Sequence, residues 1–172
     1  MPQLPFDPIA EARRQWDVHW GPDHTPQMSA VISIFRAQQI VLSRLNELLE
    51  PLELTYPRYE ALMLLSYTKH GELPLGKVSD RLQVHRASVT NVIDKLVAHG
   101  YVERVLHAED RRAVLARITP DGKRVARRAT KLLHGANFGV DPLTREDCEA
   151  IFSQLRPLRA GAGDFADASG GD

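Results

Sequence analysis

Apolar residues recur at helical spacing over most of this chain. The first such stretch covers residues 7–20, where Asp7 can cap a helix and Pro8 suits its first turn. The second runs from about Gln27 to Glu50 and has a wide apolar surface that includes Val31, Phe35, Leu42, Leu45 and Leu49. A helix that is apolar on so much of its circumference usually packs against more than one neighbour, and we expect a partner chain to be the second.

The middle of the chain has the pattern of short helices joined by tight turns. Thr55 and Pro57 open a helix that we expect to reach about His70-Gly71. A short helix follows, with Leu75, Val78 and Leu82 on one face. Residues 83–85 then form a turn before a second helix, Arg86 to His99, which ends at Gly100.

Two strands and two helices complete the pattern. Residues 102–106 and 113–118 alternate as the strands of a hairpin, and Thr119-Pro120 begins a helix that ends near Gly135. The last helix, from Asp141 or Thr144 to Leu158, places Cys148 beside apolar residues, which predicts that this cysteine is buried. The tail from Ala160 is rich in Gly, Ala, Ser and Asp, and we expect it to be disordered.

Together these elements predict a mainly α fold: a winged helix-turn-helix with a two- or three-stranded β-wing and a helical dimerisation region. The expected parts are an extra N-terminal helix (1–24), dimerisation helices (27–54 and 120–158), the winged helix-turn-helix (55–119) and the tail (160–172). In such a fold the second helix of the helix-turn-helix lies in the major groove of DNA.

Composition supports this prediction once charge is divided by region. The 172 residues carry 22 Lys/Arg and 22 Asp/Glu, so the formal net charge is zero. Residues 69–131, however, hold 14 Lys/Arg against 7 Asp/Glu, a balance that suits phosphate neutralisation, although a solvated surface would also explain it. The absence of a leader pattern and of a long apolar run, with the single cysteine, predicts a cytoplasmic protein.

The helix at 86–99 has a polar face suited to reading bases. Opposite its apolar residues lie Arg86, Ser88, Thr90, Asn91 and Lys95. Asn can pair with adenine, Arg can pair with guanine, and the methyl group of Thr can touch that of thymine. Ser88 and Thr90 could instead bind phosphate, which positions a protein without reading sequence.

The tip of the predicted hairpin carries Asp110, Arg111 and Arg112. Asp110 could hold an arginine extended towards the minor groove, where narrow A·T tracts concentrate negative potential. The two arginines could equally contact phosphates or remain solvated, and we favour contact with DNA.

The spacing of these motifs resembles the MarR family of bacterial transcription regulators. The resemblance rests on Asp110-Arg111-Arg112 and on Ile118-Thr119-x-x-Gly122, preceded by the segments at 92–96 and 100–104. It implies an obligate homodimer that binds double-stranded DNA at a pseudo-palindromic operator. It also implies a repressor that is released by a small ligand.

The N-terminal helix with Trp16 is similar to that of the PecS-type, urate-responsive branch of this family. The resemblance implies a ligand site that includes Trp16, Glu60 and Arg104. Trp16 could instead lie in the core or at a dimer interface, and Glu60 could be an ordinary exposed acid of its helix. Arg104 could instead pair with Glu103, Asp110 or a phosphate. The recognition-helix arginine of that branch falls on Val92 here. Urate would therefore lack a charge partner, and a less charged aromatic ligand is a better expectation.

Catalytic and metal-binding patterns are missing from the sequence. The seven histidines are scattered without zinc-ligand spacing, and nothing resembles a phosphate-binding glycine loop or paired catalytic carboxylates. We therefore expect no enzyme activity, no metal and no cofactor. The remaining alternatives are a winged helix that binds another protein and an architectural DNA binder that needs no ligand.

Overall fold

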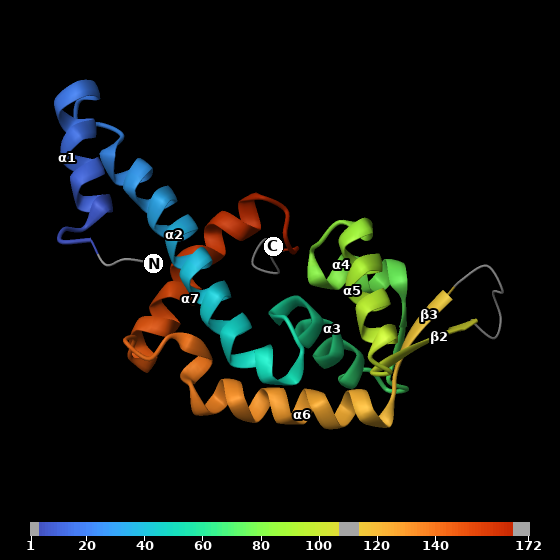
Figure 1. The fold of residues 1–172 in the computed structure, drawn as a ribbon. Helices are drawn as coiled ribbons and strands as arrows, with labels where there is room; N and C mark the ends of the chain where they lie inside the picture. Colours follow the sequence, from blue (N-terminus) through green and yellow to red (C-terminus); the bar gives the residue numbers. More distant parts are fainter. Residues whose placement is uncertain (1–3, 107–113, 167–172) are drawn as a thin grey trace. The chain divides into compact units, whose positions relative to one another are not determined.

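The computed structural model describes residues 4–106 and 114–166, which form mostly helices and one small antiparallel sheet (Figure 1). One compact unit ends at Arg44 and a second begins at Leu45, within the same long helix. The predicted fold class is therefore confirmed, including the larger of the two predicted numbers of strands.

The first unit is a helical hairpin of α1 (Pro8–Trp20) and the start of α2 (Thr25–Leu49). Asp7 caps α1 as predicted, since its Oδ1 accepts a hydrogen bond from the backbone N–H of Ile9 at 2.8 Å. Gly21 follows with φ +81°, in the left-handed region that glycine adopts without strain. The hydroxyl of Thr25 donates to the carboxylate of Asp17, so α2 begins two residues earlier than the sequence predicted.

The core of the second unit surrounds α3 (Tyr56–Ser66), in which Leu62 and Leu65 are fully buried. The end of α2 and the short helix η1 (Glu50–Leu52) lead into it. The side chain of Thr55 does not cap α3. Instead, Oδ1 of Asn46 accepts from the N–H of Tyr56 at 2.8 Å. The predicted end of this helix near His70 is wrong, because the N–H of Thr68 turns back to Leu65 O and breaks the helical pattern.

The sheet has the order β1-β3-β2 and lies beside this core (Figure 1). β2 (Val102–Leu106) and β3 (Val114–Ile118) form the predicted hairpin, and β1 (Glu72–Pro74) pairs with the other edge of β3. Arg117 in the central strand is opposite Glu72 on one side and Glu103 on the other. Its guanidinium bonds to both carboxylates, at 2.6 Å from Glu72 and 3.4 Å from Glu103.

Helices α4 (Leu75–Leu82) and α5 (Arg86–Ala98) form the predicted helix-turn-helix and both pack on α3. The turn between them contains Gln83 in the left-handed region, at φ +54°. The hydroxyl of Ser79 donates to the carbonyl of Val84 at 2.6 Å and fixes the turn.

Helix α6 (Pro120–Gly135) begins at the base of the wing, in close contact with Gly100 and Tyr101 shortly after the end of α5. Thr119 caps it, accepting from the N–H of Gly122 at 3.0 Å and donating to the carbonyl of Gly100 at 2.8 Å. A side chain at position 122 would collide with the backbone carbonyl of Tyr101, so this contact requires glycine. The wing, the end of α5 and the start of α6 are therefore one tightly packed junction.

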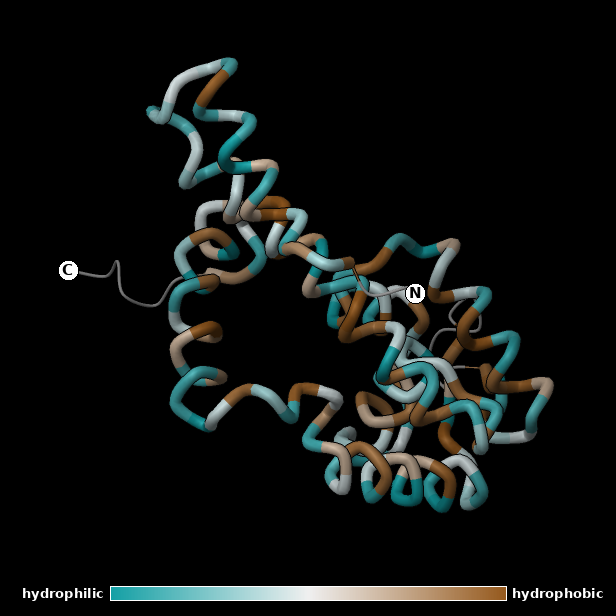
Figure 2. Tube along the Cα trace, turned by 60° about the vertical axis from the view of Figure 1, so that its left-hand side comes forward, coloured by the Kyte–Doolittle hydropathy of each residue, from teal (hydrophilic) through white to brown (hydrophobic). Residues whose placement is uncertain are grey.

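The short helix η2 (Asn137–Gly139) connects α6 to α7 (Arg145–Gly161), which Thr144 and Asp147 cap reciprocally. Figure 2 shows hydrophobic and hydrophilic residues alternating along α7, yet none of its residues is buried. The prediction that Cys148 is buried is wrong for the single chain, because none of the described elements covers that face.

The disorder predicted from Ala160 is also wrong for residues 160–166. The helix α7 continues to Gly161, and Nε of Arg159 donates to Oδ2 of Asp164 at 2.6 Å. The ring of Phe165 lies 5.0 Å below the guanidinium of Arg156, so ion pairing and cation–π contact order this segment.

Candidate nucleic-acid interface

The polar face predicted for DNA contact is exposed along α5. All five of its predicted residues are exposed: Arg86, Ser88, Thr90, Asn91 and Lys95. The opposite face holds the helix on the core through Val89, Ile93 and Leu96, which are at most 2% exposed. Val97 lies among the apolar residues of the helix, for which burial is the expectation, but it is 37% exposed.

The N-terminus of α5 is capped by a residue that the sequence reasoning assigned only to the turn. Nδ1 of His85 accepts from the N–H of Ala87 at 3.3 Å, and the side chain is exposed. Histidine is not among the preferred caps, so no strong sequence signal pointed to this role. His85 therefore stands beside Arg86 at the end of the helix whose N-terminal residues meet base edges in a helix-turn-helix.

The hydroxyl of Thr90 is already engaged within α5. It donates to the backbone carbonyl of Arg86 at 3.1 Å. Phosphate oxygens only accept hydrogen bonds, so a phosphate contact through this hydroxyl would require that bond to break. The bonding favours the other predicted contact, in which the methyl group of Thr90 meets a thymine methyl.

An ion pair joins the recognition helix to the wing. One guanidinium nitrogen of Arg104 in β2 lies 2.6 Å from Oδ1 of Asp94 in α5. Asp94 is the acidic residue on the polar face of α5, where an unpaired carboxylate would repel phosphates. The pair with Arg104 reduces that repulsion and ties the orientation of α5 to the strand.

The base of the wing is held by Arg117 between its two carboxylates. The hydrogen bond to Glu72 and the nearby charge of Glu103 raise the pKa of Arg117 above its ordinary value. These bonds cross all three strands and fix the direction in which β2 and β3 leave the core. The residues predicted at the wing tip, Asp110, Arg111 and Arg112, lie outside the described residues.

The residues implied as ligand contacts come from three different elements. Trp16 on α1 is 36% exposed, with its ring centroid 6.4 Å from that of Trp20. Glu60 on α3 is exposed at the surface, although the surrounding protein still desolvates it enough to raise the pKa of its carboxyl. Arg104, the third, is bonded to Asp94. Trp16 belongs to the first unit, whereas Glu60 and Arg104 belong to the second.

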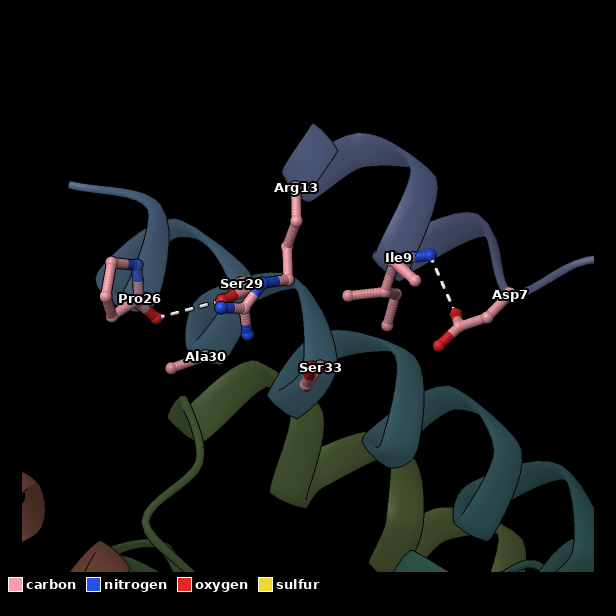
Figure 3. A pocket seen from close by; sticks show the side chains of 8 residues that line it. Asp7, Ile9, Arg13, Pro26, Ser29, Ala30 and Ser33 are labelled. Atoms are coloured by element: carbon pink, nitrogen blue, oxygen red, sulfur yellow. Dashed lines mark hydrogen bonds between the residues drawn. The ribbon is translucent and has the colours of Figure 1, made fainter. Parts of the chain in front are cut away.

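The first unit contains an open pocket between α1 and α2, of about 630 Å³ (Figure 3). Figure 3 shows the side chain of Arg13 lying from α1 towards Ser29 of α2, whose hydroxyl donates to Pro26 O at 3.1 Å. The residues that line this pocket are Asp7, Ile9, Ala10, Arg13, Pro26, Ser29, Ala30 and Ser33. Trp16 is not among them.

Metal-ligand clusters and membrane-spanning helices are both missing from residues 4–106 and 114–166. Within these ranges no three side chains of His, Cys, Asp or Glu gather as metal ligands would. No helix in the same ranges combines the length and apolar character that crossing a membrane demands.

Comparison with known proteins finds transcriptional regulators that resemble this chain. Residues 54–114 match the sequence profile of the MarR family. The crystal structure of Sco5413, a MarR family transcriptional regulator from Streptomyces coelicolor, is 45% identical with a TM-score of 0.77, over 83% of this chain and 99% of that one. The organic hydroperoxide resistance transcriptional regulator of Bacillus subtilis is 27% identical over 125 residues, which are 73% of this chain and 83% of the relative.

The fold is also that of a protein solved on DNA. A mutant of MarR from E. coli, in complex with operator DNA, superposes with a TM-score of 0.70 at 22% identity, over 79% of this chain and 97% of that one.

Proposed function

Because this chain belongs to the MarR family of DNA-binding transcriptional regulators, which are not enzymes, we propose that it is a homodimeric repressor released from its operator by a small ligand. The observation that supports DNA reading most directly is the polar face of α5, where every predicted contact residue is exposed. A two-fold symmetric dimer would bind a pseudo-palindromic operator, since protein and site then share the same symmetry. We expect this function in the cytoplasm, where the chromosome of a bacterium is found.

The residues of α5 have distinct roles in this proposal. Arg86 and Asn91 read base edges, and the Thr90 methyl group contacts thymine. Ser88 and Lys95 bind phosphates and set the register of the helix in the groove. Arg111 and Arg112 contact the minor groove or its phosphates, with Asp110 holding one of them extended.

Homodimer formation is supported by the apolar side chains that the single chain leaves uncovered. Val31 and Phe35 on α2 are 49% and 63% exposed, and on α7 Phe152 and Leu158 are 61% and 64% exposed. Phe152→Glu should therefore convert the dimer into a monomer, as measured by sedimentation velocity. Lys131→Glu, on the polar side of α6, is the control and should leave the dimer intact. An unchanged dimer in Phe152→Glu would contradict the assignment of α7 to the interface.

Release by a ligand is the less direct part of the proposal. Trp16, Glu60 and Arg104 are each proposed as ligand contacts, and an aromatic, weakly charged molecule is the expected ligand because Val92 provides no charge. The bond between Arg104 and Asp94 gives such a ligand a route to α5, because capturing Arg104 would leave Asp94 unpaired beside phosphates.

The first test is fluorescence anisotropy with duplex DNA from upstream of the gene that encodes this protein. Scrambled duplex is the control, and two salt concentrations are needed because phosphate contacts make affinity depend on salt. We expect the native duplex to bind about a thousandfold more tightly or better. Equal salt-dependent binding of both duplexes would favour an architectural DNA binder, and the absence of binding would favour a protein-binding winged helix.

A further inference from the structure

The outer face of α6 carries a row of cations that the DNA-reading residues do not include. Its members, which we call the α6 stripe, are Lys123, Arg124, Arg127, Arg128 and Lys131, and all are exposed. At about 100° per residue, they cover an arc of about 140° centred opposite the buried residues of the helix. The stripe is therefore centred on the solvent-facing side of α6.

This arrangement works against the stability of the helix. Like charges at spacings of three and four residues repel each other, and the stripe contains five such pairs, for example Lys123–Arg127 and Arg124–Arg128. Cations near a helix N-terminus also oppose the helix dipole. Among the described residues, Arg124 is the one member with a carboxylate partner, Asp121. A structural role does not account for charges that destabilise the element carrying them.

The stripe faces away from the helix that reads DNA. The buried side of α6 packs on α3, and both α4 and α5 contact α3 as well. Figure 1 shows α3 between α6 and the α4–α5 pair. A duplex bound to the polar face of α5 therefore lies on the far side of α3 from the stripe, so the anion that matches these charges is a different molecule.

A groove beside the stripe has a different character. It has a volume of about 490 Å³ and lies between α3 and α6. Met63 and Ser66 line it from α3, and Ala126 and Thr130 line it from α6. The hydroxyl of Thr130 donates to Ala126 O at 2.9 Å, which leaves the floor largely apolar. Three cations of the stripe form the remaining wall: Lys123, Arg127 and Lys131.

We propose that the α6 stripe and this groove bind a small phosphorylated molecule, with its phosphates on the stripe and an apolar group in the groove. The five cations lie within nine residues, and the first and last are about 12 Å apart along the helix, which matches a chain of two or three phosphates better than a single anion. Guanidinium groups bind phosphate through paired hydrogen bonds, and three of the five cations are arginines. Binding of this molecule does not depend on the proposed function; only an effect of that binding on the release of DNA does.

Binding itself can be tested without DNA, by isothermal titration of the full chain with ATP, tripolyphosphate and adenosine. ATP should bind more tightly than tripolyphosphate, and adenosine more weakly than either. The variant R127Q/K131Q should lose about tenfold or more in affinity for ATP. The variant K69Q/R145Q removes the same charge from exposed positions elsewhere and should stay within about twofold of the parent. Ser66→Phe fills the groove and should weaken ATP but not tripolyphosphate.

Three results would overturn the inference: no saturable binding of ATP or tripolyphosphate at millimolar concentration, an equal loss in both double variants, or an equal effect of Ser66→Phe on both ligands. Removing like charges should not lower the Tm of R127Q/K131Q, so a loss of binding is separable from unfolding.

A second measurement excludes DNA as the occupant of the stripe. Anisotropy with operator duplex should give R127Q/K131Q the same salt dependence as the parent chain. A slope that becomes shallower by about two units would mean that both cations contact phosphates of DNA, and the inference would be wrong. If no duplex bound specifically, the proposed function would fail, while the titrations with ATP would still decide the inference.

Discussion

The ion pair between Arg104 and Asp94 gives the sharpest test of how the wing supports the recognition helix. The 2.6 Å contact joins side chains that are 37% and 57% exposed, respectively, so it should contribute only about 0.2–1 kcal/mol to the free energy of unfolding. The expected effect on DNA binding is larger. In Arg104→Gln, the carboxylate of Asp94 would stand unpaired beside phosphates. Two like charges about 7 Å apart repel by roughly 0.6–2.4 kcal/mol for dielectric constants of about 80 to 20.

We therefore expect Arg104→Gln to weaken operator binding by roughly 1–2 kcal/mol, about fivefold to thirtyfold. Asp94→Asn should bind at least as tightly as the parent, because it removes the repelling charge. The double variant D94N/R104Q should recover most of the affinity lost in Arg104→Gln. Anisotropy at two salt concentrations measures all four proteins, and urea unfolding measures the smaller coupling in stability.

The outcome that refutes this reasoning is additivity. If the loss in D94N/R104Q equals the sum of the two single losses, the residues act independently and the pair does not hold α5 for DNA. A loss confined to stability, with operator affinity unchanged, would assign the pair to folding alone.

Single substitutions at four other positions have equally definite expected outcomes. Gly122→Ala should lower the free energy of unfolding by about 1–3 kcal/mol or more, because the new Cβ meets the carbonyl of Tyr101. Urea unfolding measures this loss, and an unchanged midpoint of the urea transition would contradict the close contact. Lys95→Ala should make the salt dependence of DNA binding shallower by about one unit, and an identical slope would place Lys95 in solvent. Arg112→Ala should weaken operator binding by about 1–3 kcal/mol if the arginine reads a base edge, whereas equal anisotropy curves would exclude that contact. Because folding raises the pKa of Glu60, ionisation of its carboxyl destabilises the folded chain once the pH rises above the unfolded pKa. Glu60→Gln should therefore raise the Tm at about pH 7 but not at about pH 3. Equal shifts of the Tm at both pH values would contradict this.

The elements that the sequence predicted well are those whose signals are local. Asp7 and Thr119 are preferred caps followed by proline, and the structure uses both as caps. The spacing of Leu75, Val78 and Leu82 similarly located α4, since a buried face at helical period needs no distant partner to be recognised.

The features that the sequence analysis missed are set by contacts that apolar periodicity does not record. The end of α3 depends on turn hydrogen bonds of Thr68 that periodicity does not record. β1 has three residues and ends in proline, so it exists only because β3 lies beside it. The partner of Arg104 was sought at Glu103, Asp110 or a phosphate. The carboxylate that binds it, Asp94, is ten positions away and becomes a neighbour only when β2 packs against α5.

The division of charge along the chain has a consequence for the rate at which the protein meets DNA. A chain with a formal net charge of zero feels little overall attraction to DNA, yet the excess of cations in its segment from 69 to 131 gives that segment a local positive field. The field of DNA turns such a molecule as it diffuses, so that it tends to arrive with its basic segment first. Added salt should therefore slow association by removing the orientation of encounters, and not only by weakening the complex once it has formed.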